Sequence, residues 1–345
     1  MTTSEELVVP DVMSVGPTWA LLYRGSERLL EQDLTPNTEY DIHGATFRTL
    51  AKPAGTLISR FATVNDVHFG ETEAGKMEGT DIGPVLSVEP GATPYPQVMN
   101  DSIAHDMAAH DVDLVVVKGD LTASGTDEQF EAFRRCYEDR FKEKLLYVRG
   151  NHDAYQHQNF AAWPTQLREL PGCTVALLDT TLPGSSSGQL SADQLEWLAD
   201  STADQRQPVV VLGHHHVWDP GSTERHDNYF GIHPDWSERL IELATRHPRI
   251  VAYAAGHTHR NRVRRFAATG EMPWIEVACA KDFPGSWATY EVYEGGILQI
   301  HHRASSTAAV AWSERCREMF FGLYADYALG TSADRCFEIP LRRAG

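Results

Sequence analysis

Strand-like and helical segments alternate between residue 57 and about residue 256, and this alternation restricts the fold more than any other feature of the chain. Short apolar runs at 57–64, 114–118 and 145–148 are typical of buried strands. Segments with helical spacing lie between them, at 96–110 and 126–141. Such alternation is typical of layered architecture in which helices cover a sheet. The sequence therefore predicts an α/β fold.

Five polar clusters directly follow the apolar runs, each at the point where a predicted strand ends. Ligands of layered α/β folds bind outside the carboxyl ends of the strands, so we expect the five clusters to meet in one place. Their oxygen and nitrogen donors suit manganese, iron or zinc better than calcium. The residues in question are Asp66 and His68, then Asp120, then Asn151 with His152 and Asp153, then the triplet His214, His215 and His216, and finally His257 and His259.

The spacing within the clusters supports a binding site. In Asp66-Val67-His68 and in the second pair, His257 and His259, alternation places both donors on one side of an extended backbone. Glycines next to the donors permit a close approach of the backbone. A single pair of this kind is usually a turn or a helix cap. Five of them in order, each at a predicted strand end, favour a metal site instead.

The ordered set resembles the calcineurin-like metallophosphoesterase family, whose pattern is DxH, GD, GNH(D/E), a lone His and then GHxH. All five elements occur in this order between residues 66 and 259. The Gly-Asn-His-Asp form at 150–153 and the histidines at 214–216 are most similar to class III cyclic-nucleotide phosphodiesterases. The resemblance implies a four-layer α-β-β-α sandwich with metals at the strand ends.

The resemblance also implies a metal-binding role for seven residues. One ion would be held by Asp66, His68 and His259, a second ion by Asn151, His215 and His257, and Asp120 would bridge both. Relatives often carry His-His-Pro and use the first histidine of that pair. Aligning Val217 with the proline selects His215, and His214 is the alternative.

Two-metal hydrolysis is the mechanism that the resemblance implies, with a metal-bridging hydroxide attacking a small phosphodiester such as a cyclic nucleotide. His152 is expected to protonate the leaving oxygen or to stabilise charge on the phosphoryl group. Asp153 is expected to orient His152 or a metal-binding histidine. Three alternatives stay open: a phosphomonoesterase, a phospholipid- or nucleotide-linked diesterase on the same core, and a metal-binding scaffold without activity.

Both ends of the chain lie outside the α/β pattern. Residues 1–54 contain two strand-like stretches and are similar to the end of the fibronectin-like β module of purple acid phosphatases, with an irregular arm as the alternative. Residues 55–303 are the predicted catalytic domain. Residues 304–345 are predicted to be a C-terminal helical tail that caps the site, mediates dimerisation or covers an apolar face. Ala123 occupies the position of the iron-binding tyrosine of purple acid phosphatases, so a coloured ferric site is not expected.

Composition narrows the partners and the compartment. The formal net charge of −18 weighs against long nucleic acids but not against small phosphorylated substrates. No apolar run reaches the length of a membrane span, and the first fifteen residues lack the features of a secretory signal. The five cysteines are too few and too scattered for a disulfide framework. We expect a cytoplasmic protein, and a homodimer is left open.

Overall fold

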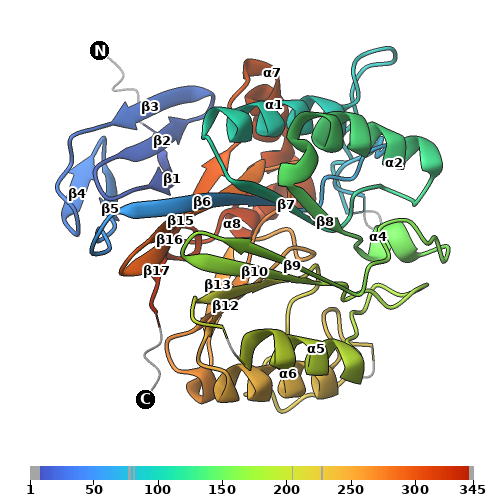
Figure 1. The fold of residues 1–345 in the computed structure, drawn as a ribbon. Coiled ribbons are helices and arrows are strands. Elements are labelled where there is room, and N and C mark those ends of the chain that lie inside the picture. Colours follow the sequence, from blue (N-terminus) through green and yellow to red (C-terminus); the bar gives the residue numbers. More distant parts are fainter. Residues whose placement is uncertain (1–7, 77–78, 81, 204, 227, 342–345) are drawn as a thin grey trace, which may run out of the picture.

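The computed structural model describes residues 8–76, 79–80, 82–203, 205–226 and 228–341. Two six-stranded sheets lie face to face between outer layers of helices (Figure 1). The first sheet has the order β17 (Phe337–Ile339), β16 (Gly296–Arg303), β15 (Ser286–Tyr293), β6 (Leu57–Val64), β7 (Leu114–Lys118) and β8 (Leu145–Val148). The second has the order β13 (Arg262–Arg265), β14 (Pro273–Glu276), β12 (Ile250–Ala255), β11 (Val209–Leu212), β10 (Cys173–Leu178) and β9 (Thr165–Leu170).

Helices cover the outer face of each sheet. The first sheet is covered by α1 (Tyr95–Ala109), α2 (Asp127–Phe133) and α7 (Thr307–Arg315). The second sheet is covered by α5 (Ala192–Ala203) and α6 (Pro234–Arg246). The predicted four-layer α-β-β-α sandwich is therefore confirmed.

The central strands are apolar throughout because both of their faces are buried. In β7, Leu114 and Val116 point into the core between the two sheets, while Val115 and Val117 point toward the helices. Successive side chains of a strand alternate between faces, so one strand supplies two cores. This explains why residues 114–118 form an unbroken apolar run.

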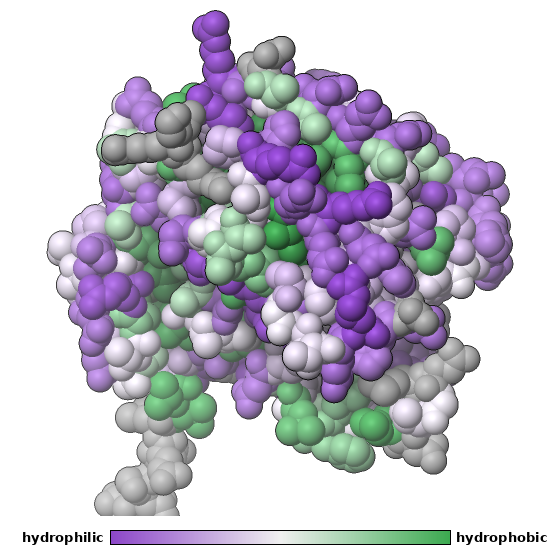
Figure 2. All heavy atoms as spheres, turned by 90° about the horizontal axis from the view of Figure 1, so that it is seen from below, coloured by the Kyte–Doolittle hydropathy of each residue, from purple (hydrophilic) through white to green (hydrophobic). Residues whose placement is uncertain are grey.

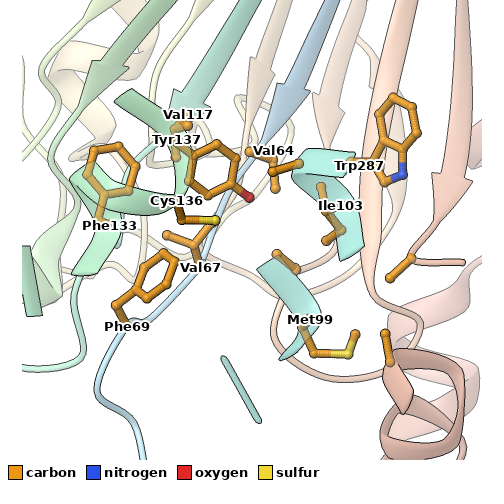
Figure 3. Packing of buried hydrophobic residues seen from close by; sticks show 14 of the residues in the cluster. Val64, Val67, Phe69, Met99, Ile103, Val117, Phe133, Cys136, Tyr137 and Trp287 are labelled. Atoms are coloured by element: carbon orange, nitrogen blue, oxygen red, sulfur yellow. The ribbon is translucent and has the colours of Figure 1, made fainter. Parts of the chain in front are cut away.

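The outer core beside α1 also orients the first polar cluster. Val67 and Phe69 belong to this core, together with Phe133, Tyr137 and Met99 (Figure 3). Their burial on one side of the chain leaves Asp66 and His68, the polar residues that alternate with them, on the other side. Hydrophobic packing therefore helps to present the donors of this loop.

The strands that precede the polar clusters run parallel within each sheet. β6, β7 and β8 are parallel neighbours, and so are β10, β11, β12 and β14. Parallel neighbours end at the same edge, so the loops that follow them are brought together.

The N-terminal arm contains more strands than the two that were predicted. A three-stranded sheet is formed by β1 (Asp11–Val15), β2 (Ala20–Arg24) and β3 (Glu27–Glu31), and β4 (Glu39–Ile42) pairs with β5 (Ala45–Arg48). The arm packs on β16 through Leu298 and Ile300, which point away from the core between the sheets. In Figure 1 it lies at the opposite side of the molecule from α4 (Asn151–Ala154).

The C-terminal segment is helical only in part. After α7 come a kinked turn (Cys316–Gly322), α8 (Leu323–Leu329) and α9 (Ser332–Arg335). The chain then ends in β17, which pairs with β16 and completes the first sheet. A strand of three residues carries too little periodicity to be predicted from sequence. The division into 1–54, 55–303 and 304–345 stays a prediction.

The face seen from below Figure 1 is mostly hydrophilic, and its hydrophobic residues lie in small separate patches (Figure 2). No helix in the described part of the chain has the length and apolar character of a membrane span. The five cysteines are buried free thiols.

Candidate metal centre and active site

Backbone hydrogen bonds join four of the five loops that carry the polar clusters into two pairs. The amide of Asp66 donates to the carbonyl of Gly119 at 3.1 Å, and the amide of His68 donates to that of Asp120 at 2.9 Å. Between the loops that follow β12 and β11 of the second sheet, the amide of Gly256 donates to the carbonyl of His214 at 2.9 Å. The predicted convergence at the strand ends is what the structure shows.

Asp120 lies at the centre of the converging side chains. Its Oδ2 is 3.3 Å from Nε2 of His68 and 3.3 Å from Nε2 of His214. Its Oδ1 accepts a hydrogen bond from the amide of His152 at 2.9 Å. One carboxylate oxygen between two imidazole nitrogens is the arrangement expected of a residue that bridges two metal ions.

The other donors fall into two groups on either side of Asp120. On one side, Oδ1 of Asp66 is 3.4 Å from Nε2 of His259, and donor atoms of Asp66, His68 and His259 all lie within 4.8 Å of one another. On the other side, Oδ1 of Asn151 is 3.0 Å from Nε2 of His214. The structure thus brings all the predicted loops to two adjacent groups of donors.

The three consecutive histidines have different surroundings. Nδ1 of His214 donates to the carbonyl of Lys118 at 2.8 Å, which directs Nε2 toward Asn151 and Asp120. Nδ1 of His215 instead lies 2.9 Å from the hydroxyl of Thr180. The His215 ring is 4.5 Å from that of His257, between ring centroids.

His214 and His215 both have a ring nitrogen within 4.8 Å of one on His257, so the choice between them as the ligand beside Asn151 stays a prediction. The choice of His215 depended on aligning Val217 with a proline. Val217 forms an isolated β-bridge with Ile232.

Backbone strain is concentrated in the predicted ligands. Left-handed φ values occur at Asp66 (53°), His68 (46°), Asp120 (49°), His257 (68°) and His259 (55°). Each such conformation costs a non-glycine residue roughly 1 kcal/mol or more, and such residues cluster at functional sites. Bending these loops toward one another is thus energetically unfavourable locally and is held by the surrounding structure.

Glycine permits the closest approach within the site. A Cβ atom added to Gly119, whose φ is +87°, would lie 2.5 Å from Nδ1 of His214. One added to Gly256 would lie 2.6 Å from Oδ2 of Asp66. The expectation that glycines beside the donors allow close packing is met at both positions.

The donor set fits metal ions in its chemistry and in its charge. Nε2 of His257 is buried without a hydrogen-bond partner among the described residues, which is costly for a polar atom that binds nothing. Burial lowers the pKa of His257 well below its usual value, so its lone pair is free. Burial opposes ionisation of Asp66, but the neighbouring His259 and His214 outweigh it and the pKa of Asp66 falls to about 2. Carboxylate, amide and imidazole donors of this kind suit manganese, iron or zinc.

His152 and Asp153 have distinct environments. Nδ1 of His152 donates to the carbonyl of Ala123 at 2.8 Å, and the ring lies 4.4 Å from that of His68. The carboxylate of Asp153 accepts hydrogen bonds from the amides of Gly150, Leu121 and Thr122 and from the Thr122 hydroxyl.

The role expected of Asp153 therefore needs correction. The hydrogen bonds described for its carboxylate include none to a histidine. Instead, it fastens the loop that carries Asp120 to the loop that carries Asn151.

Buried charged side chains that lie outside the five motifs hold His68 in position. Oε2 of Glu71 lies 2.8 Å from Nδ1 of His68. Oε1 of Glu71 accepts from Nζ of Lys281 and from the hydroxyl of Tyr95, both at 2.7 Å. A carboxylate behind a metal-binding histidine fixes its orientation and tautomer. The only sequence signal for Glu71 was an acidic residue three positions after His68, while Lys281 lies 210 residues away.

The donors open into a pocket of about 550 Å³. One part of its wall comes from loops of the α/β sandwich, and the other part comes from the C-terminal segment. Besides Asp120, Asn151, His152, His257 and His259, the lining residues are Lys76, Tyr155, Phe230, Thr258, Phe320, Leu323, Tyr324 and Tyr327. Of the three roles left open for the tail, the structure thus shows that it contributes to the active-site wall.

The arginines that follow the last motif do not line this pocket. Nε of Arg260 pairs with the buried carboxylate of Glu276 at 3.0 Å, and Arg264 donates to the carbonyl of Val217 at 2.6 Å. Their contacts are with the protein, and they stabilise the β13 edge rather than a phosphate site.

Comparison with known proteins agrees with this site. The calcineurin-like phosphoesterase family matches residues 59–261, which is more than half of the chain. A probable cyclic nucleotide phosphodiesterase from Synechococcus sp. is 24% identical over 201 residues, covering 55% of this chain and 76% of that protein. A probable glycerophosphodiester phosphodiesterase from Arcobacter nitrofigilis is 26% identical over 209 residues, covering 55% of this chain and 73% of that protein.

A solved structure shows the same fold. A dimetal phosphatase from Danio rerio superposes with a TM-score of 0.55 at 13% identity, over 83% of this chain and all of that one. The chain belongs to the calcineurin-like phosphoesterase family and is a metal-dependent phosphoester hydrolase.

Proposed function

We propose that the chain is a dinuclear phosphodiesterase that hydrolyses a small phosphodiester of the cyclic-nucleotide kind. The observation that carries this proposal is the position of one Asp120 oxygen, 3.3 Å from Nε2 of both His68 and His214. The relative named as a probable cyclic nucleotide phosphodiesterase supports the substrate class. The pocket volume of about 550 Å³ suits a small ester.

We assign the ligands from the distances between donors. Asp120 would contact both ions, with manganese, iron or zinc as the metals, and His214 takes the place first given to His215. When bound, the two ions polarise the phosphoryl oxygens and lower the pKa of a water molecule. Asp66, His68 and His259 hold one ion, and Asn151, His214 and His257 hold the other.

His152 supplies a proton to the leaving oxygen. Nδ1 of His152 donates its hydrogen to the carbonyl of Ala123, so Nε2 is the nitrogen that can exchange a proton with the leaving oxygen. His152 lines the pocket, where the leaving oxygen would lie. General acid catalysis of this kind contributes roughly 10²–10⁴-fold to the rate.

The test uses metal-stripped protein reloaded in turn with manganese, iron and zinc. We expect hydrolysis of bis-para-nitrophenyl phosphate to return with metal, to exceed that of para-nitrophenyl phosphate, and to vanish in His257→Ala. No hydrolysis with any metal would contradict the proposal. A higher rate on the monoester would replace the diesterase by a phosphomonoesterase on the same core.

A paired substitution tests the choice between the consecutive histidines. We expect His214→Ala to lose one of two bound metal ions and most of the activity, because Nε2 of His214 lies between Asn151 and Asp120. His215→Ala should keep both ions. The reverse result would restore His215 as the ligand.

A further inference from the structure

We propose that the C-terminal tail forms a binding wall for a flat aromatic group on the substrate. The enzyme would then select phosphoesters that carry one aromatic arm, such as a nucleobase or an aryl ring. This inference rests on the proposed function, because the wall is adjacent to the metal centre. It concerns residues 320–327, which lie outside the region that matches the family.

Aromatic side chains face the pocket from both of its sides. From the sandwich, Phe230 stacks on His257 with ring centroids 3.9 Å apart, and 50% of Phe230 remains exposed. From the tail, Phe320, Tyr324 and Tyr327 line the pocket. Large apolar side chains left exposed around one cavity indicate a binding site. Flat aromatic surfaces gain most from stacking with another ring.

The wall is fixed to the loop that carries the metal ligands. The hydroxyl of Tyr327 donates to the carbonyl of Thr258 at 2.8 Å, between His257 and His259 in the chain. The hydroxyl of Tyr324 donates to Asp282 at 2.6 Å, and the amide of Asn261 donates to the carbonyl of Ala328 at 3.0 Å. The aromatic wall and the metal centre therefore hold a defined position relative to each other, as specificity for one arm of an ester requires.

The turn before α8 is strained in order to present this wall. Phe320 and Phe321 have φ values of 51° and 57°, followed by Gly322 at 86°. Left-handed conformations are unusual and unfavourable for bulky residues. The amide of Phe321 donates to the carbonyl of Gly83 at 2.9 Å, which helps to hold the turn. As a result Phe320 lines the pocket, while 76% of Phe321 is exposed.

The charges around the pocket favour a single phosphoryl group. Outside the metal-binding and catalytic residues, Lys76 is the one cation among the lining side chains that the structure describes. Its Nζ pairs with Glu73 at 2.7 Å. A second phosphate would therefore meet aromatic rings rather than free positive charge. An ester with one phosphoryl group and one aromatic arm matches this surface.

The experiment measures binding of two phosphonates to zinc-loaded protein by calorimetry. Phenylphosphonate and methylphosphonate present the same anionic group to the metals and differ only in their arm. We expect the parent protein to bind phenylphosphonate at least about tenfold more tightly, the value of one aromatic stack. Phe320→Ala and Leu323→Ala should each lower this preference about threefold or more. Phe321→Ala, in the same turn but outside the pocket, should leave it unchanged.

Leu323→Ala keeps the test valid if Phe320→Ala unfolds, because 74% of Leu323 is exposed. Equal binding of the two phosphonates by the parent, or an unchanged preference in Leu323→Ala, would overturn the inference while leaving the proposed function intact. Tighter binding of octylphosphonate than of phenylphosphonate would also overturn it, because the wall would then recognise a chain rather than a ring. Failure of the proposed function would instead appear as no binding of any phosphonate and no hydrolysis of methyl para-nitrophenyl phosphate.

Discussion

The N-terminal arm and the C-terminal tail both lie outside the region that matches the family, yet of their described residues only those of the tail reach the active site. The arm packs on the outer face of β16 through a cluster that includes Phe47 and Leu298, and it contributes no residue to the described lining of the metal pocket. The tail leaves the same sheet, crosses to the loops at the strand ends and returns as β17. Two segments that look equally peripheral in sequence thus have different relations to the chemistry.

The difference follows from what each segment touches. Trp312 in the tail donates to the carbonyl of Lys281 at 3.0 Å and stacks on Tyr95 at 4.2 Å between ring centroids. Tyr95 and Lys281 both donate to Glu71, the carboxylate behind His68. A continuous set of contacts therefore runs from the tail to His68, a predicted metal ligand. Arg335 of the tail, by contrast, binds the carbonyl of Met13 and fastens the arm at a distance from the site.

Removal of one buried aromatic from each segment is the strongest test of this comparison. We expect Trp312→Ala and Phe47→Ala each to lower the free energy of unfolding by roughly 3–5 kcal/mol, because both side chains are buried. Only Trp312→Ala should also weaken metal binding and hydrolysis, measured at a temperature where both variants are folded. Reduced hydrolysis in Phe47→Ala under the same conditions would break the comparison.

A milder change tests the last contact in that set. Glu71→Gln removes the charge beside Nδ1 of His68 and should weaken metal binding by about 10–100-fold, as loss of a supporting carboxylate typically does. Competition with a fluorescent chelator measures the affinity. Excess metal should restore hydrolysis.

The matched control for that change is Glu291→Gln. The two glutamate side chains are 18% and 16% exposed, and each pairs with a cation at 2.7–2.8 Å. Glu291 pairs with Arg60, away from the pocket. Equal metal affinity in both variants would show that Glu71 only stabilises the fold.

Low pH should destabilise the contact between the arm and β16, in which His301 lies. Nδ1 of His301 lies 3.2 Å from the carbonyl of Met13, and Nε2 lies 2.7 Å from the Ser286 hydroxyl. Burial, reinforced by the positive charge of Arg335, lowers the pKa of His301 well below its usual value. The unfolded chain then binds a proton below about pH 6.5 that the folded chain does not, so stability falls as the pH drops below 6.5 and is unaffected above it.

The size of this pH dependence follows from the single proton that the unfolded chain binds and the folded chain does not. Urea unfolding between pH 5 and pH 8 should show that His301→Gln reduces the low-pH slope by up to about 1.4 kcal/mol per pH unit. Hydrolysis at pH 8 should not change. An identical slope in parent and variant would contradict the prediction.

The smallest expected effect concerns a single hydrogen bond of the tail. Tyr327→Phe removes the bond to the carbonyl of Thr258 and should cost about 0.5–1.5 kcal/mol. Because this bond positions α8, the preference for phenylphosphonate should fall as well. Tyr40→Phe in the arm removes a comparable bond to the amide of Thr35 and should leave that preference unchanged.

Sequence reasoning succeeded where local patterns determine structure. The strands β6, β7 and β8 lie at the predicted residues because strands buried on both faces require unbroken apolar runs. The motif residues lie together because they follow strands that run parallel within each sheet, although their binding of metal stays a prediction. The direction of each backbone turn could not be predicted from the sequence. No sequence pattern shows whether His214 or His215 points into the site, because the chain bends between them.

Contacts between distant segments were also hidden from sequence. Glu71 and Lys281 are 210 residues apart, and each has an ordinary charged neighbourhood in the chain. The strained turn at Phe320 and Phe321 contradicts local preference, so a continuous helix was the natural expectation for the aromatic segment. In both cases tertiary packing outweighs what the local sequence favours.

Metal content is the most direct test of the proposed dinuclear centre. We expect purified protein, saturated with zinc and freed of loose metal by gel filtration, to retain two ions per chain by inductively coupled plasma mass spectrometry. His259→Ala should retain one ion, and Asp120→Ala should retain at most a fraction of one, because Asp120 is assigned to both. One ion in the parent protein, or two ions in Asp120→Ala, would contradict a centre bridged by Asp120.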